Sequence, residues 1–147
     1  MTFVVDASIA AKWFMQEDLH AEALLLLASP ARLAAPDLIV AEIGNIAWKK
    51  CLRGEIPRDQ AKVMAVAVGG YIPTLLSAAD LAERALDLAL ALQHPVYDCL
   101  YLACAEFLGG ILVTADLRFR DALRGTPQEA LVLYPGDPGF VSALTMR

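Results

Sequence analysis

The most strongly patterned part of the chain is the segment 95–116, PVYDCLYLACAEFLGGILVTAD. It predicts one helix, ended by a Gly-Gly pair, and then one short strand. Between Asp98 and Asp116 the only charged residue is Glu106, and a helix that is apolar on nearly all sides is a buried helix. Asp98 falls in its first turn, and a carboxylate there is unfavourable unless a cation or a polar partner compensates it. This segment therefore predicts a functional acid on a buried helix.

Short apolar strands alternate with helices along the rest of the chain. The pattern predicts strands at 3–6, 32–35, 71–76, 111–114 and 130–133, and further helices at 9–14, 19–28, 37–53, 57–68, 81–92 and 117–124. Gly69 and Gly70 are expected to end the fourth of these helices, and Pro73 predicts that the third strand lies at an edge. The alternation indicates an α/β fold with a mostly parallel sheet and helices on both faces.

The size and composition of the chain fit one folded unit. Its 147 residues predict a single domain, 1–147, in which the tail from about residue 135 begins as turns. Hydrophobic residues make up 58% and charged residues 20%, which excludes a disordered chain. The net charge of −5 argues against a constitutive nucleic-acid binder, which is usually basic. It is compatible with an enzyme whose acidic centre takes up a metal ion before it meets phosphate.

The cysteines and the apolar segments indicate the cellular compartment in which the protein is expected. Cys51, Cys99 and Cys104 are odd in number and show no CxxC spacing, which predicts reduced, buried residues of a cytoplasmic protein. No secretory signal is visible, because Asp6 interrupts the short apolar N-terminus. The uncharged segment 63–79 contains glycine and proline breaks, so we expect no membrane span.

Carboxylates are placed where a parallel sheet gathers its functional groups. Asp6 follows the first strand and Asp116 the fourth, and strand ends that flank a switch point face one crevice. Glu42 and Asp98 lie in the first halves of helices whose N-termini point to the same edge. Four carboxylates would repel each other there without a cation. Mg²⁺ or Mn²⁺ suits such oxygen ligands, and the sequence offers no zinc-binding set of Cys and His.

Each of these residues also has a simpler structural explanation. Asp6 and Ser8 could cap a helix, and Thr114 could form a strand-end hydrogen bond. Glu42 shares a helix face with Asn45 and Lys49, so it could be a solvated residue with a lysine neighbour. With a metal ion, the same acids could hold a phosphodiester and activate water, and the two hydroxyls could support them.

Four short motifs occur in order: an N-terminal apolar strand followed by D-A-S, then PDLIVAEIGN, YDCLYLACA, and LVTAD with LRF behind it. In this order and at these intervals the chain resembles the PIN-domain family over residues 2–133. Among the branches of that family it looks most like the VapC-type ribonuclease toxins of toxin–antitoxin pairs.

The resemblance implies a compact three-layer α/β/α sandwich around a parallel sheet of about five strands. It implies that the catalytic and metal-binding acids are Asp6, Glu42, Asp98 and Asp116, with Ser8, Asn45 and Thr114 as supporting polar residues. The implied reaction is Mg²⁺-dependent (or Mn²⁺-dependent) endonucleolytic cleavage of RNA that leaves a 5′-phosphate, with one or two ions. The implied partners are the RNA substrate, a small cognate antitoxin and a second copy of the chain in a homodimer.

Basic residues outside the acidic centre would have to hold the RNA. Arg118 and Arg120 are preferred because they follow Asp116 closely, and Lys49 is a further candidate. Each of them also fits an ordinary solvated surface.

Other functions remain open at this stage. A phosphotransferase or phosphatase could use Asp6 as nucleophile, although haloacid-dehalogenase-like enzymes need a second Asp at the position of Ser8. A receiver-like signalling module fits poorly, because the second strand is followed by proline and a helix. A phosphodiesterase that is not a toxin, or an inactive PIN-like binding scaffold, would share the fold; the presence of all four acids argues against the scaffold.

Overall fold

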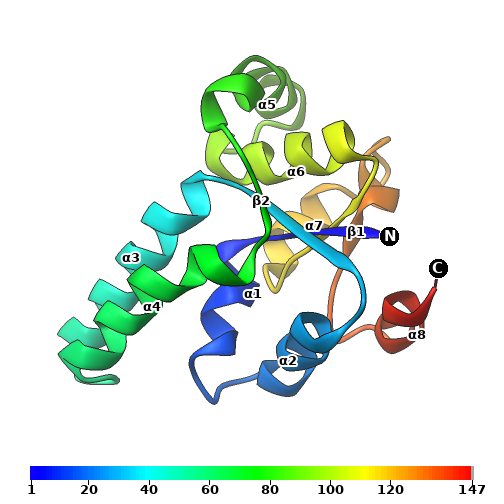
Figure 1. Cartoon of the computed structure of the whole chain (residues 1–147). Helices are drawn as coiled ribbons and strands as arrows, with labels where there is room; N and C mark the ends of the chain where they lie inside the picture. Colours follow the sequence, from blue (N-terminus) through cyan, green and yellow to red (C-terminus); the bar gives the residue numbers. More distant parts are fainter. Residues whose placement is uncertain (147) are drawn as a thin grey trace.

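A five-stranded parallel sheet forms the centre of the molecule (Figure 1). The structure is a computed structural model that describes residues 1–146. The strands are β1 (Thr2–Val5), β2 (Arg32–Pro36), β3 (Thr74–Leu76), β4 (Ile111–Val113) and β5 (Val132–Leu133). They lie in the order β3-β2-β1-β4-β5, and every neighbouring pair is parallel. The predicted α/β sandwich is therefore confirmed, including the edge position of β3, which directly follows Pro73.

Helices cover both faces of the sheet (Figure 1). On one face, α6 (Val96–Leu108) contacts β1, β2 and β4, and α5 (Ala78–Leu92) packs on α6. The other face carries α1 (Ala7–Ala10), the 3₁₀ helix η1 (Ala11–Trp13), α2 (His20–Ala28) and α8 (Phe140–Thr145). The remaining helices are α3 (Leu38–Leu52) and α4 (Arg58–Tyr71), which pack against each other, α7 (Leu117–Ala122) and the 3₁₀ helix η2 (Glu129–Leu131).

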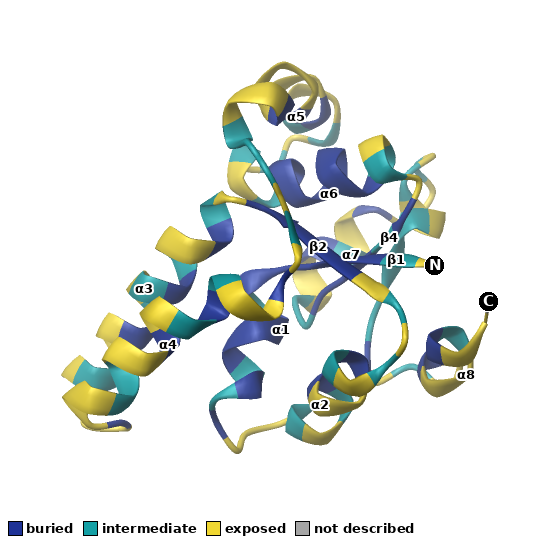
Figure 2. Ribbon diagram, viewed as in Figure 1, coloured by how far each residue is buried: buried dark blue, intermediate teal, exposed yellow. Residues whose placement is uncertain are grey.

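The central helix α6 owes its position to its composition. Every residue from 99 to 105 is buried, as Figure 2 shows by the dark blue of this helix. Tyr101, only 1% exposed, is among the largest fully buried side chains. The prediction of a buried helix is confirmed, and Gly109 ends it in the left-handed conformation with φ 59°. Among residues 1–146, each helix is too short or too polar to cross a lipid bilayer.

Several predicted boundaries were wrong, and those around the third and fifth strands matter most. Gly69 and Gly70 do not end α4, which continues to Tyr71, because glycine lowers helix stability without breaking the backbone hydrogen bonds. The strand after it shrinks to Thr74–Leu76. The last strand keeps only Val132 and Leu133, because the preceding residues form η2. The tail, which the sequence left unassigned, forms α8 and buries Phe140 and Leu144.

Gly110 lies where α6 passes into β4 and the chain approaches β1. A Cβ atom at this position would lie 2.7 Å from the carbonyl oxygen of Thr2, a backbone atom that cannot move aside. We expect Gly110→Ala to lower the free energy of unfolding by about 1–3 kcal/mol, measured by urea denaturation.

The matched control is Gly69→Ala in α4, where a Cβ atom meets nothing within 4 Å. There the same change should raise the free energy of unfolding by up to about 1 kcal/mol, because alanine is the better helix former. Equal stability of Gly110→Ala and the unchanged protein would contradict the close approach.

Candidate active site

A crevice is expected where the strand order of the sheet reverses. The chain passes from β1 to β2 and β3 on one side, and then returns to β4 on the other side of β1. The switch point therefore lies between the carboxyl ends of β1 and β4. Asp6 directly follows β1, and its backbone N–H donates to the carbonyl oxygen of Val113, the last residue of β4, at 3.3 Å. Topology thus places Asp6 at the switch point.

Asp6 is a buried carboxylate with several hydrogen-bond donors around it. The residue is 8% exposed. Its Oδ1 accepts from the Ser8 hydroxyl at 2.5 Å and from the Ile9 N–H at 3.1 Å, and its Oδ2 accepts from the Thr114 hydroxyl. The Ile9 bond makes Asp6 the N-cap of α1. Helix capping and a place at the switch point are therefore both properties of this one side chain.

Thr114 joins Asp6 to a second predicted acid. Its Oγ1 donates to Asp6 and accepts from the backbone N–H of Asp116 at 3.0 Å. The Asp116 side chain then caps α7, because its Oδ1 accepts from the Phe119 N–H at 3.1 Å. The Ser8 hydroxyl oxygen makes a second link between the two strand ends, because it accepts from the Ala115 N–H at 3.0 Å. The two predicted supporting hydroxyls thus tie the ends of β1 and β4 together.

Two further predicted acids lie beside Tyr101. Asp98 stands in the first turn of α6 with a half-exposed side chain, and Glu42 comes from α3. The Oε1 atom of Glu42 and the Tyr101 hydroxyl are buried atoms for which the described residues supply no hydrogen-bond partner of good geometry. Buried polar groups normally have such a partner. The Tyr101 phenol faces Glu42 and lowers its pKa, but its poor geometry leaves the carboxylate incompletely satisfied, as expected of a site that a ligand completes.

The pKa shifts show that three of the acids share one environment. Burial raises the pKa of Asp6 from 3.8 to about 6; the bonds from Ser8, Thr114 and Ile9 lower it, and the charge of Asp98 raises it further. Burial also raises the pKa of Glu42. The facing Tyr101 phenol lowers this pKa, and the charge of Asp98 raises it. The pKa of Tyr101 is raised by burial first, and then by the charges of Glu42, Asp6 and Asp98. Asp6, Glu42 and Asp98 therefore surround Tyr101 closely enough to interact.

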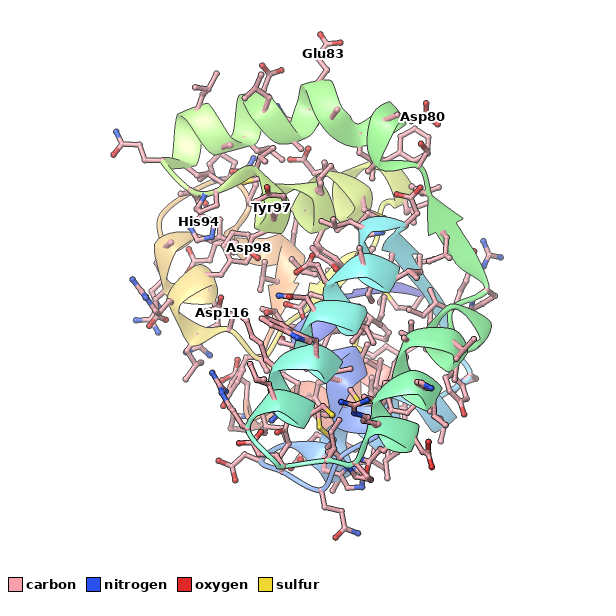
Figure 3. All side chains as sticks on the ribbon, turned by 90° about the vertical axis from the view of Figure 1, so that its left-hand side faces the viewer. Asp80, Glu83, His94, Tyr97, Asp98 and Asp116 are labelled. Carbon is pink, nitrogen blue, oxygen red and sulfur yellow. The ribbon has the colours of Figure 1, made fainter. Side chains whose placement is uncertain are left out.

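Figure 3 shows Asp98 and Asp116 on the same side of the molecule, with His94 and Tyr97 beside Asp98. Asp80 and Glu83, in contrast, point away from this region on α5. Among residues 1–146, no three His, Cys, Asp or Glu side chains already converge as metal ligands do. Carboxylates repel one another at short range, and Asp98 has another partner. The structure thus brings the acids to one region without bringing their oxygens to one point.

That partner is His94, to which the sequence assigned no role in the site. Its Nε2 lies 2.6 Å from Oδ2 of Asp98, and its ring lies against Phe119 with the ring centroids 4.6 Å apart. Phe119 is also the residue whose N–H binds Asp116. His94 lies in the loop before α6, so its contact with Asp98 follows no helical spacing rule that the sequence could have shown.

The predicted RNA-binding residues divide into two groups. Lys49 and Asn45 on α3 line a surface groove together with Glu42 and Tyr97. Arg118 is exposed on α7. Arg120 instead donates from Nη1 to both oxygens of Asp137, at 3.0 and 3.1 Å, and its guanidinium lies 5.1 Å from the ring centroid of Tyr134. Its charge is thus already paired within the protein, so Arg118 is the better candidate of the two.

Comparisons with known proteins identify the family to which the fold belongs. Residues 3–124 match the family model of the PIN domain. The chain is 34% identical over 118 residues to Ribonuclease VapC3 of Pyrobaculum aerophilum, an alignment that covers 79% of this chain and 90% of that protein. The crystal structure of PAE2754 from Pyrobaculum aerophilum has a similar fold, with a TM-score of 0.65, 23% identity, and coverage of 98% of this chain and 89% of that one.

The burial of Asp6 predicts a pH-dependent stability of the metal-free protein. Its pKa is about 6 in the folded state and close to 3.8 when unfolded, so as pH rises from 4 the unfolded chain releases this proton first. The stability that this group contributes is therefore lost as pH rises, by about 2 kcal/mol between pH 4 and 7. Asp6→Asn removes the titration, so its free energy of unfolding relative to the unchanged protein should increase over this range, measured by urea unfolding in chelator.

The matched control is Asp80→Asn, which makes the same chemical change at an exposed aspartate on α5 (Figure 3). A stability difference between Asp6→Asn and the unchanged protein that stays constant from pH 4 to 7 would show that the carboxyl is not buried as described.

Proposed function

The chain belongs to the PIN-domain family, and from that premise we propose that it is a Mg²⁺- or Mn²⁺-dependent endoribonuclease that acts as the toxin of a toxin–antitoxin pair. The observation that carries the proposal is the buried Asp6 at the switch point, connected through Thr114 to Asp116 and coupled electrostatically to Asp98. The similarity to Ribonuclease VapC3 supports the choice of RNA as substrate.

The donor set fits a hard divalent cation. Asp6, Glu42, Asp98 and Asp116 would hold the ion, and carboxylate oxygens are the ligands that Mg²⁺ and Mn²⁺ prefer. The unpartnered Oε1 of Glu42 and the raised pKa of Asp6 are what a site that needs a positive charge would show. When bound, the ion would activate water and offset the charge of the scissile phosphodiester.

The protein's own residues would orient the acids. Ser8 and Thr114 fix Asp6 from both sides through their hydroxyls. His94 takes one oxygen of Asp98, which leaves the other oxygen for the ion. Such outer partners hold metal-binding side chains in one orientation and raise the affinity of the site. The phosphotransferase alternative has less support, because Ser8 stands where haloacid-dehalogenase-like enzymes need a second Asp, and its hydroxyl instead donates to Asp6.

The proposed partners follow from the same similarity. A toxin of this kind would have a small cognate antitoxin that blocks the acidic region. A homodimer is supported by large apolar side chains that α5 and α6 leave exposed, namely Leu86, Leu90 and Phe107. Two exposed cations would contact RNA phosphates. Lys49 lines the same groove as Glu42, and Arg118 follows Asp116 by two residues.

The first test is cleavage of structured RNA by the purified protein in Mg²⁺ or Mn²⁺. Asp98→Asn, or addition of a chelator, should reduce the cleavage rate by about 100-fold or more, because each removes part of the metal site. Asp80→Asn, an exposed acid on α5, serves as the control and should cleave at the normal rate. Cleavage that persists at full rate in chelator, or in Asp98→Asn, would refute the metal-dependent mechanism.

The second test concerns His94 and measures metal affinity instead of activity. His94→Phe keeps an aromatic ring beside Phe119 but removes the contact with Asp98. Mn²⁺ affinity, followed by paramagnetic resonance titration, should fall by about tenfold because Asp98 loses its orientation. His20→Phe, at the other histidine, should leave the affinity unchanged. If His94→Phe binds Mn²⁺ as tightly as the unchanged protein, His94 does not orient the site.

A further inference from the structure

A surface groove of about 430 Å³ lies beside the acidic residues. Its polar lining consists of Glu42, Asn45 and Lys49 from α3 and Tyr97 from α6. Glu42 is shared with the proposed metal site, and Tyr97 precedes Asp98 in the chain. The groove therefore leads directly from the acids along the surface of α3, and the proposed chemistry does not use Asn45 or Tyr97.

The polar side chains from α3 and α6 that line the groove are free to bind a ligand. Among residues 1–146, the side chains of Asn45, Lys49 and Tyr97 take part in no ion pair or side-chain hydrogen bond. The next residue along, Lys50, shows the contrast: it faces a different hollow and is paired with Glu17 at 3.1 Å and with Glu55 at 3.5 Å. A cation, an amide and a phenol that are all unengaged around one groove indicate a surface that binds a polar ligand.

Tyr97 is unusual for its helix. It is 62% exposed, although the residues after Asp98 on α6 are buried from 99 to 105. An exposed aromatic ring offers a flat apolar face at small conformational cost, and such rings stack with bases in proteins that bind single-stranded nucleic acid. Figure 3 shows Tyr97 directly beside Asp98. Any base that stacks there would thus be adjacent to the acids.

The order of groups along α3 matches a nucleic-acid strand that leaves the acidic centre. Glu42, Asn45 and Lys49 lie at i, i+3 and i+7, so they share one face. Their spacing spans about 10 Å along the helix axis. The acidic end of this face would meet the scissile phosphate through the metal ion, and the cationic end would meet a neighbouring phosphate. The amide between them can donate to and accept from a base edge or a ribose hydroxyl.

We propose that this groove is a subsite for one unpaired RNA base next to the scissile phosphate, with Tyr97 stacked on the base, Lys49 on a flanking phosphate and Asn45 on the base edge or the ribose. The proposal rests on the ribonuclease function proposed above and adds that the substrate is single-stranded at this position. A base inside a duplex is already stacked on both faces and cannot meet Tyr97.

The test measures binding of a single-stranded RNA that carries one 2-aminopurine, in Mg²⁺ and in the Asp98→Asn background to prevent cleavage. Stacking on Tyr97 quenches the fluorescence of 2-aminopurine, so binding and stacking are read together. Tyr97→Leu should weaken binding by about tenfold and abolish the quenching, whereas Tyr97→Phe should keep both, because the phenyl ring still stacks.

The matched control is Trp48→Leu on α3. Trp48 is 57% exposed and lines a different hollow, so its loss should leave RNA binding unchanged. An abasic site placed at successive positions of the RNA gives a second readout. At the RNA position whose base stacks on Tyr97, the abasic site should weaken RNA binding by the unchanged protein by about tenfold. With that abasic RNA, Tyr97→Leu should cause no further loss of affinity. A merely structural role of Tyr97 would not produce this coupling.

The outcomes separate the two proposals. If the unchanged protein cleaves RNA and Tyr97→Leu binds RNA with the same affinity and quenching, the subsite is refuted and the ribonuclease function stands. The same result is expected if the groove binds a protein segment instead of RNA. If the unchanged protein neither binds nor cleaves RNA, the ribonuclease function is refuted and the subsite with it.

Discussion

The structure depends on the burial of one carboxylate, that of Asp6, at the point between β1 and β4 where the order of the strands reverses. Asp6 is buried between β1 and β4, and such burial raises the free energy of its charged form. Hydroxyl and amide donors from Ser8, Ile9 and Thr114 offset part of this cost and leave the pKa above its usual range. The result is a site that is partly satisfied by the protein and that a positive charge would complete. The neighbouring elements are arranged around this requirement.

Secondary structure and site chemistry use the same atoms here. Asp6 caps α1 and Asp116 caps α7, so each acid is oriented by the helix that it starts. Thr114 connects the two through one hydroxyl group, and the His94 ring connects Asp98 to Phe119 at the start of α7. The sequence interpretation treated helix capping and a functional role as alternatives for Asp6. The structure shows that capping fixes the direction of the Asp6 and Asp116 carboxylates at the ends of β1 and β4, so capping does not exclude the proposed role.

Local pattern predicted most of the fold, because apolar strands and a wholly apolar helix can be recognised in a few residues. The placement of Asp6 and Asp116 was also predictable, since parallel strands share a carboxyl edge. Contacts between distant segments were not. The pairing of Arg120 with Asp137 joins residues 17 apart and depends on how the tail folds back. His94 was missed for a smaller reason, because its role depends on the ring of Phe119 behind it. The burial of Glu42 against Tyr101 likewise needs α3 and α6 to meet.

The contacts that hold Arg120 show that the folded unit extends beyond the residues matched by the family model. The family match stops at residue 124, yet Asp137 and Tyr134 hold the Arg120 side chain, and Arg120 belongs to the short helix that begins at Asp116. The C-terminal segment therefore supports α7 from outside the family match, through Asp137 and Tyr134. A chain trimmed at residue 124 would keep Asp6, Glu42, Asp98 and Asp116 but lose this support for the helix that Asp116 caps.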